Sequence, residues 1–273
     1  MRIDLIAVGE LMLDVIVPPL RPGRAAHDRI DVRAGGIPVT AALAARRTGA
    51  AAVVAGRVGD DPAAAAIEHA LSQAGVDLWL AIDAQLPTGT FVQSGDAIVA
   101  ERGANAALAA GDLPATLDAR CVLVSGYALL HQDTSAAGRA AIERARADHV
   151  AVIAPAAPLV ERVGARGFHQ LAEGATAVIA NDEEARVLTG LEPRQAAAQL
   201  ARRYSLACVT AGAAGAFAAT SDEVLHAPAA GDGAGQMMGA GDAFAGVLLS
   251  SLVRGARLGD ALSAACAEAG RRA

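Results

Sequence analysis

The chain has 273 residues, of which 53% are hydrophobic and 3% aromatic, and its formal net charge is −6 at pH 7. A composition this apolar provides a large core, and the negative charge disfavours nucleic acid or an anionic membrane as the main partner. All 23 basic residues are arginine. This excludes chemistry that requires a lysine, such as a Walker A phosphate loop or a pyridoxal-phosphate Schiff base.

The three cysteines, Cys121, Cys208 and Cys266, are far apart and form no C-x-x-C pair. They are typical of small buried residues in a reducing compartment, not of a disulfide framework or a zinc site. No segment has the roughly 18 uninterrupted apolar residues of a membrane span. We therefore expect a cytoplasmic protein without membrane or nucleic-acid partners.

The N-terminal part predicts a buried strand followed by partly exposed ones. Leu5 to Val8 is a short apolar run that ends at Gly9, which is typical of a buried parallel strand. Ile30 to Arg33 alternates cleanly and predicts a half-exposed strand, and Glu10 to Val17 alternates more loosely around Asp14. A lone acid among apolar neighbours is more often a strand-end or turn residue than a ligand, so both interpretations of Asp14 stay open.

From residue 38 onward, helical and strand patterns alternate. Helices are predicted at 38–47, 62–73, 134–146, 182–189, 193–203 and 243–253, and strands at 52–55, 76–80, 121–125, 149–153, 176–180 and 206–210. This alternation implies a mostly parallel sheet with helices on both faces, whose ligands bind at the carboxyl ends of the strands. Segments 90–93 and 97–101 predict a hairpin, which together with the N-terminal alternating strands would form a small separate sheet.

The stretch Gly239-Ala240-Gly241-Asp242 directly precedes the helical run over 243–253. Glycines admit a ligand close to the backbone, and N–H groups at a helix N-terminus attract anions. A carboxylate beside such an anion cradle suits the removal of a proton from a hydroxyl that attacks a phosphoryl group. In a chain this rich in alanine and glycine the triplet also arises by chance, and a second copy, Gly233-Ala234-Gly235, is followed by Gln236 instead of an acid.

Further fragments occur in the order and at the approximate spacing of one family. They are Gly9-Glu10 with Asp14, Gly35-Gly36-Ile37-Pro38, Gly56-Arg57-Val58-Gly59-Asp60-Asp61, Gly75-Val76-Asp77, Gly103-Ala104-Asn105-Ala106-Ala107-Leu108, Asn181-Asp182-Glu183-Glu184, Thr210-Ala211-Gly212-Ala213-Ala214-Gly215 and Gly239-Ala240-Gly241-Asp242. Each is weak alone, but the series resembles the PfkB (ribokinase-like) family of carbohydrate and nucleoside kinases over essentially the whole chain. The resemblance implies one kinase domain over 1–273, with a Rossmann-like three-layer α/β/α core, a mostly parallel sheet and a small β-sheet lid from segments about 12–34 and 88–104.

The resemblance assigns the chemistry to the glycine-rich stretch. Asp242 is the expected base that deprotonates the acceptor hydroxyl. The amides of Gly239, Ala240 and Gly241 are the expected anion hole for the transferring γ-phosphoryl group, because they would stabilise charge that develops in the transition state.

For the nucleotide, the resemblance implies ATP and Mg²⁺. Asn181 and Glu184 match the family's N-x-x-E motif, in which Glu184 acts on Mg²⁺ indirectly, through water. Asn181 equally suits a helix N-cap at the end of a strand. Thr210, Gly212 and Gly215 are expected to line the nucleotide, although an ordinary strand–turn–strand hairpin fits the same residues.

On the substrate side, Asp14 and the Gly35-Gly36 loop match positions at which the family holds sugar hydroxyls. An exposed carboxylate is a natural acceptor for a vicinal diol. Thr40 stands where the family usually carries a substrate-contacting Asn. Asn105, at the return of the lid, is a weaker substrate candidate, and Arg102 beside it equally fits a solvated lid charge.

The chain departs from the family at the phosphate-side loop and after one strand. Gln236-Met237-Met238 replaces the usual Asp-Thr-x, which in many members belongs to a monovalent-cation site, and Ala154-Pro155 replaces the usual Asp-Pro. The thioether of Met237 is a poor ligand for an alkali ion. We therefore expect an activity that does not depend on K⁺, and these losses leave the efficiency of turnover open.

The leading expectation is an ATP-dependent kinase that phosphorylates a hydroxymethyl group of a sugar or sugar derivative. The retained Asp242 favours catalysis, whereas the changes at Ala154 and Gln236 favour the alternative of a catalytically weak relative that binds sugar or nucleotide. A nucleoside is the alternative substrate class, but Phe91 alone is evident in the lid for stacking a base, which favours a simple sugar. Because alternating lid strands cannot bury both faces, we expect a homodimer through the lid.

Overall fold

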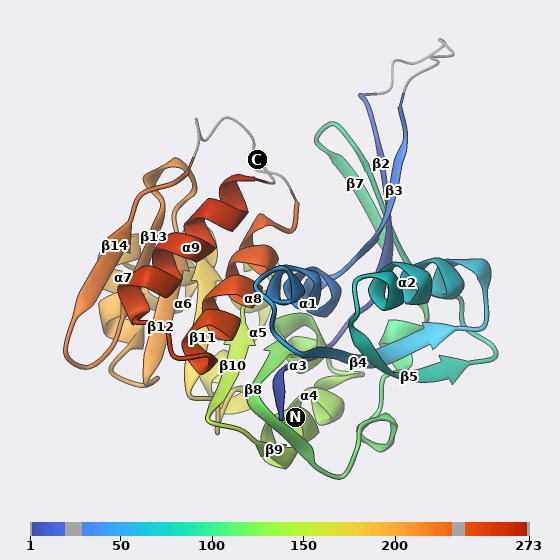
Figure 1. Ribbon diagram of the computed structural model, residues 1–273, viewed down its shortest axis with the longest axis horizontal. Helices are drawn as coiled ribbons and strands as arrows, with labels where there is room; N and C mark the ends of the chain where they lie inside the picture. The colour runs from blue at the N-terminus through green and yellow to red at the C-terminus, as the bar shows by residue number, and fades with distance from the viewer. Residues whose placement is uncertain (1, 20–28, 231–237, 272–273) are drawn as a thin grey trace.

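The computed structural model of the protein describes residues 2–19, 29–230 and 238–271, and Figure 1 shows how its elements are arranged. The strands of the central sheet are β1 (Ile3–Val8), β4 (Ala52–Gly59), β5 (Asp77–Asp83), β8 (Leu117–Ser125), β9 (Ala145–Arg146), β10 (His149–Ile153), β11 (Ala177–Asn181), β12 (Leu206–Thr210), β13 (Ala216–Ala219) and β14 (Val224–Ala227). Their order is β14-β13-β12-β11-β10-β8-β1-β4-β5, with β9 paired to β8. The pairings from β12 to β5 are parallel, and β13 pairs antiparallel with both β12 and β14. The mostly parallel sheet predicted from the sequence is confirmed.

Helices cover both faces of this sheet. One face carries α1 (Ile37–Arg47), α2 (Pro62–Gln73), α8 (Ala240–Val253) and α9 (Leu258–Gly270), and the other carries α3 (Gly126–Leu130), α4 (Ser135–Arg144), α5 (Ala157–Leu171), α6 (Asp182–Thr189) and α7 (Pro193–Leu200). Successive strand residues point to opposite faces. Accordingly Leu5 and Ala7 pack in the core beneath α1 and α8, while Ile6 and Val8 pack in the core on the opposite face of the sheet. The protein is thus a three-layer α/β/α structure (Figure 1).

A second, smaller sheet projects from the core at the upper right of Figure 1. It contains β2 (Met12–Val17), β3 (Asp31–Gly35), β6 (Gly89–Ser94) and β7 (Ala97–Glu101), in the order β3-β2-β6-β7. β2 and β6 are parallel, and the outer strands β3 and β7 are antiparallel to their neighbours. The separate lid sheet is therefore confirmed, although residues 20–28 of the expected lid segment lie outside the described residues.

Where the lid joins the core, segments of the backbone contact one another closely at two glycines. Gly36, with φ 90°, lies so close to the backbone carbonyl of Glu10 that a Cβ would overlap its oxygen. Gly103, with φ 50°, lies equally close to the carbonyl of Pro87. Positive φ and the missing Cβ are both properties of glycine. At these two positions, the segments that enter and leave the lid pass so close to each other that no side chain would fit between them.

Asp61 ties the start of the lid hairpin to the core. Its carboxylate caps α2 by accepting a hydrogen bond from the Ala64 N–H (2.9 Å), and it also accepts from the N–H and the hydroxyl of Thr88 (both 2.7 Å). The Thr88 hydroxyl oxygen accepts in turn from the Gly59 N–H (2.9 Å). Burial acts to raise the pKa of Asp61, but these hydrogen bonds lower it on balance, so the carboxylate stays charged and links Thr88 to α2.

The fold differs from the sequence prediction in several elements. The helices α3, α5 and α9 were not predicted, and β9 begins at Ala145, within the helix predicted over 134–146. In α5, Gly164 has φ 74° and ψ 157° and separates two helical segments. The sequence analysis also ended the strand over 52–55 at Ala55, whereas β4 continues to Gly59 and pairs with β5 from Val53 to Gly59. Within the described residues, no helix is long and apolar enough to cross a bilayer.

The contact between α1 and α8 generates the first prediction. A Cβ on Gly246 would overlap the Ala41 carbonyl oxygen and lie 2.8 Å from the Ala41 Cα. Because both helices are packed against the sheet, neither can move away freely, and Gly246→Ala should lower the free energy of unfolding by about 2 kcal/mol. Denaturant unfolding measures the change.

Gly259→Ala in α9 is the matched control. A Cβ there would meet only Leu225 Cδ1, at an ordinary 3.8 Å. This substitution should be neutral or stabilising by up to about 1 kcal/mol, because alanine favours helix. Equal effects of the two substitutions would contradict the close helix contact.

Candidate active site

The predicted anion cradle lies at the N-terminus of α8. Gly239 caps this helix with φ 84°, and Ala240, Gly241 and Asp242 form its first turn. A Cβ built on Gly241 meets no atom within 4 Å, so packing within the described residues does not require glycine at this position. Open space beside helix N–H groups is the arrangement that an anion needs.

Asn181 and Glu184 form a capping box at the N-terminus of α6. The Glu184 N–H donates to Asn181 Oδ1 (2.8 Å), and the Asn181 N–H donates to Glu184 Oε2 (2.9 Å). Asn181 Nδ2 also donates to Glu184 Oε1 (2.9 Å). The N-cap interpretation of Asn181 is therefore confirmed, and the same contacts hold both side chains at the carboxyl end of β11.

Glu184 lies in an acidic environment. Burial raises its pKa to about 8; the Asn181 N–H opposes the shift, whereas the charges of Asp242, Glu183 and Asp182 add to it. Among the residues that the structure describes, no group of three or more His, Cys, Asp or Glu side chains could hold a metal ion. A divalent cation at this edge would therefore rely on water or phosphate oxygens and would be favoured by the surrounding carboxylates.

Tyr127 is a residue that sequence reasoning missed. It follows β8 in the first turn of α3, and its hydroxyl accepts a hydrogen bond from the Ala156 N–H (3.2 Å). Burial raises the pKa of Tyr127; the hydrogen bond from Ala156 opposes the shift, and the charges of Glu10, Glu184 and Asp242 add to it. Its position just after a buried strand, at the edge where ligands bind, was the signal that could have identified it.

Asp14 is not the exposed carboxylate that the sequence analysis expected. It lies within β2, is only 7% exposed, and contacts Gly35 so closely that a Cβ there would overlap its carboxylate oxygens. Arg33 Nε lies 3.7 Å from Asp14 Oδ2. Burial raises the pKa of Asp14 to about 6, and Arg33 opposes the shift. The carboxylate is thus fixed by its surroundings, with the glycine loop directly against it.

Arg102 is not a solvated lid charge either. Its guanidinium pairs with Glu10 (3.0 Å) and also contacts Asp133 (3.4 Å) and the Thr134 hydroxyl (3.4 Å). Glu10 is buried, which raises its pKa to about 7 although Arg102 opposes the shift. The sequence analysis quoted Glu10 as part of a motif and gave it no role. The structure shows it as the partner that anchors the return strand of the lid.

The side-chain amide of Asn105 faces the backbone of the segment that connects β1 to β2. Its Oδ1 accepts from the Leu11 N–H (2.9 Å), and its Nδ2 donates to the Leu11 carbonyl (2.8 Å), with the residue 1% exposed. In this arrangement the side chain stabilises the base of the lid and does not face open space. Thr40 is buried in the first turns of α1, where its N–H donates to the Gly36 carbonyl (3.0 Å).

The segment expected to line the nucleotide forms a hairpin. Thr210 ends β12 beside Asn181 in the sheet register, so both lie at the same edge. Gly212 and Gly215 follow with φ 51° and 86°, and a Cβ on Gly215 would overlap the Ala227 carbonyl oxygen. The hairpin interpretation is confirmed. The second glycine-alanine-glycine copy, with Gln236 and Met237, lies outside the described residues.

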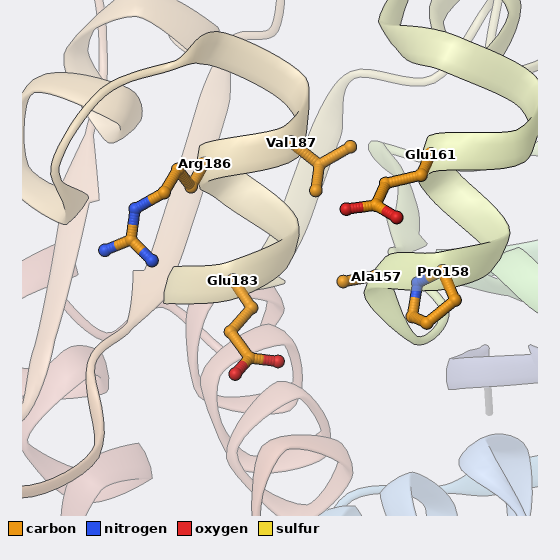
Figure 2. Close-up of a pocket in the computed structure, with 6 residues that line it drawn as sticks. All are labelled: Ala157, Pro158, Glu161, Glu183, Arg186 and Val187. Atoms are coloured by element: carbon orange, nitrogen blue, oxygen red, sulfur yellow. The ribbon is translucent and has the colours of Figure 1, made fainter.

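The described residues line two hollows. One, of about 520 Å³, lies between α5 and α6. In Figure 2, Glu161 faces Val187 across it, while Glu183 and Arg186 point away from Glu161. The other, of about 260 Å³, lies between the lid and Met238, and its lining includes Ile16, Arg33 and Gln93. Arg33, which lines the second hollow, also lies 3.7 Å from Asp14 Oδ2, and Met238 directly precedes Gly239 in the chain.

Comparison with known proteins gives the class and the family. The fold is the ribokinase-like α/β fold with a small β-sheet lid. The chain belongs to the pfkB family of carbohydrate kinases, whose family model matches residues 2–270. No curated protein matches the chain significantly.

Solved structures of several kinases share the fold. An adenosine kinase from Sinorhizobium meliloti is 21% identical, with a TM-score of 0.86 over 99% of this chain and 93% of that one. A putative ribokinase II from E. coli, solved with ATP and Mg²⁺, is 18% identical, with a TM-score of 0.86 over 98% and 92%. A fructokinase from Vibrio cholerae O395 is 23% identical, with a TM-score of 0.81 over 98% and 97%. At these identities the likeness shows the fold alone.

The buried Glu10 generates a prediction about pH and stability. Folding raises its pKa from 4.5 to about 7, so the folded chain holds the proton more tightly than the unfolded chain. Its contribution to stability is therefore complete below about pH 4.5 and is lost as the pH rises through about 7. Glu10→Gln should remove this loss, on the order of 3 kcal/mol, from the pH dependence of the free energy of unfolding.

Urea unfolding at a series of pH values measures the effect. Glu101→Gln, at an exposed position in β7, is the control for removing a lid carboxylate. Parallel pH dependences of the Glu10→Gln variant and the unmodified protein would show that Glu10 does not gain its proton on folding.

Proposed function

We propose that the protein transfers the γ-phosphoryl group of ATP to a hydroxymethyl group of a sugar or sugar derivative. The observation that carries this proposal is the position of Asp242 in the first turn of α8, directly after Gly239–Gly241, where no described atom lies within 4 Å of a Cβ built on Gly241. Membership of a carbohydrate kinase family supports it, as does the fold shared with a kinase solved with ATP and Mg²⁺.

In the proposed reaction, Asp242 accepts the proton of the acceptor hydroxyl. The hydroxyl oxygen forms a bond to the γ-phosphorus, and the bond between that phosphorus and the bridging oxygen of ADP breaks. The N–H groups of Gly239, Ala240 and Gly241 stabilise the charge on the transferring group, and the positive end of the α8 dipole adds to this effect. Because the chain has no lysine, this stabilisation has to come from amides, arginine or a metal ion.

Mg²⁺ fits the acidic edge around α6. Glu184, held by Asn181, would bind waters of the ion, and the ion would neutralise phosphate charge during transfer. The carboxylates that raise the pKa of Glu184 would favour a cation there, which is the chemistry that this environment supports. Thr210, Gly212 and Gly215 are proposed to line the nucleotide, because Thr210 shares the sheet edge with Asn181.

The acceptor is proposed to lie between Asp14 and the cradle. Asp14 would accept hydrogen bonds from sugar hydroxyls, with the Gly35-Gly36 loop against it and Thr40 in the helix that follows. A nucleoside is the alternative acceptor. A panel of sugars, sugar acids and nucleosides, mixed with protein and ATP–Mg²⁺ while ADP is followed, tests the proposal and names the class. Absence of acceptor-dependent ADP formation across the panel would favour the alternative of a catalytically weak binding protein.

Asp242→Asn tests the base. Removal of a general base should lower the turnover number at least ~10²-fold while leaving ATP affinity and thermal stability nearly unchanged. Asp260→Asn is the matched control, because Asp260 is also an acid in the first turn of a helix, α9. The proposed role would be wrong if the Asp242→Asn variant kept most of its activity.

We also propose that two copies of the chain associate through the outer face of the lid. Val32, Val15, Val92 and Val99 are opposite one another in the register of four neighbouring strands, on the face away from Asp14. Val32 is 58% and Val99 70% exposed, so the row forms an apolar stripe across the sheet. Such an apolar face on an open sheet is stabilised when a second copy covers it.

Val99→Glu should convert the dimer into a monomer. A charge in the middle of an apolar interface would be buried without a partner, which costs more than the interface gains. Ile98→Glu is the control, because Ile98 is 52% exposed and points to the opposite face of the same strand. Light scattering at tens of micromolar measures the mass, and a monomeric unmodified protein would contradict the proposal.

A further inference from the structure

Arg33 connects the lid to the residue that precedes the cradle. It lies opposite Asp14 in the pairing of β2 and β3, with its Nε 3.7 Å from Asp14 Oδ2. Its Nη2 donates to the backbone carbonyl of Met238 (3.4 Å), 205 positions further along the chain. Both contacts are long, so neither is strong alone. One planar guanidinium nevertheless joins Asp14, the carboxylate proposed to bind the substrate, to the backbone of the proposed anion hole.

The Met238 carbonyl and the Gly239 N–H belong to the same peptide unit. A peptide unit is planar, so fixing the direction of its carbonyl also fixes the direction of its N–H. Gly239 has φ 84°, a conformation that glycine adopts readily because it has no Cβ, so it carries no side chain that could fix this peptide unit. A cationic donor on the carbonyl also polarises the peptide, which makes its N–H a stronger hydrogen-bond donor.

The same two residues line one hollow. Arg33 and Met238 both contribute to the cavity of about 260 Å³ beside the lid, together with Ile16 and Gln93. The bridge from Arg33 to Met238 therefore passes along the space between the lid and α8. An acceptor held by Asp14 would lie next to this bridge.

We propose that Arg33 is a positioning residue that orients and polarises the Gly239 N–H and couples it to Asp14. The inference rests on the proposed phosphoryl transfer and adds a residue that acts through the backbone without touching the phosphate. As a consequence, one side chain fixes the positions of both the Asp14 carboxylate and the Gly239 N–H, which is the first donor of the proposed anion hole. A lid that moves away from α8 would take the guanidinium with it and release that donor.

The contact can be observed without any activity. Met238-Gly239 is the only Met-Gly pair in the chain, so labelling methionine with a ¹³C carbonyl and glycine with ¹⁵N gives one carbonyl–amide correlation in an NMR spectrum. Arg33→Gln should move this signal, whereas Arg29→Gln, which changes an exposed arginine four positions earlier, should leave it in place. An unmoved signal in the folded Arg33→Gln variant would overturn the inference.

Kinetics with the acceptor found in the panel test the consequence. Arg33→Gln should lower the turnover number about 10-fold, less than the loss of a whole anion-hole donor, while the KM for ATP changes less than about 2-fold. Arg33→Lys should recover part of the turnover, because an ammonium can still donate to the Met238 carbonyl but cannot also bridge to Asp14.

The two proposals fail in different ways. If the unmodified protein transfers no phosphate, the proposed function fails, and the labelled signal still decides whether Arg33 sets the Gly239 peptide. If the unmodified protein is active and Arg33→Gln moves the signal without lowering turnover, the positioning role is wrong. If Arg33→Gln changes only the KM for the acceptor, Arg33 acts on the substrate and not on the cradle, which also overturns the inference.

Discussion

The close contact between α1 and α8 is the constraint on which the site depends. Gly246 lies against the Ala41 backbone, and half of the eight buried residues of α1 are alanine, so the two helices approach closely. α1 begins just after Gly36, at the base of the lid, and α8 begins just after Gly239. The close approach therefore places two helix N-termini at the same end of the molecule, one beside the proposed sugar loop and one forming the cradle. A chain in which only 3% of the residues are aromatic is suited to such contacts because small side chains fill them.

Around these helix ends, the structure holds carboxylates where burial disfavours their charge. Burial raises the pKa values of Glu10, Asp14 and Glu184. Arg102 and Arg33 offset part of this effect for the first two, and Asn181 for the third. In a packed core such groups would only destabilise the protein. Each of the three already has a partner within the described residues, so the cost of burial is offset only in part, and carboxylates with perturbed pKa values of this kind are concentrated at functional sites.

The sequence predicted the features that depend on neighbouring residues better than those that depend on residues far apart in the chain. The strands and most helices follow from the spacing of apolar residues, and the cradle follows from a glycine-rich stretch before a helix. The burial of Asp14 and the bonds of Asn105 to Leu11 depend on residues distant in the chain. No local pattern contains that information, so the sequence could name Asp14 without showing that Gly35 and Arg33 enclose it. The helix α5 was missed for a local reason, since Gly164 interrupts its periodicity.

Several residues that had two competing interpretations satisfy the structural one and also stand where the proposed function would use them. Asn181 caps α6 and, through the same hydrogen bonds, holds Glu184 at the strand end. Gly215 is required by the carbonyl of Ala227 and lies in the turn that follows Thr210. This coincidence has a physical cause. Helix N-termini and glycine turns are the places where backbone N–H groups lack internal partners, so the residues that satisfy them also stand where an anion or a cation shell would bind. A structural role for such a residue is therefore no argument against a functional one.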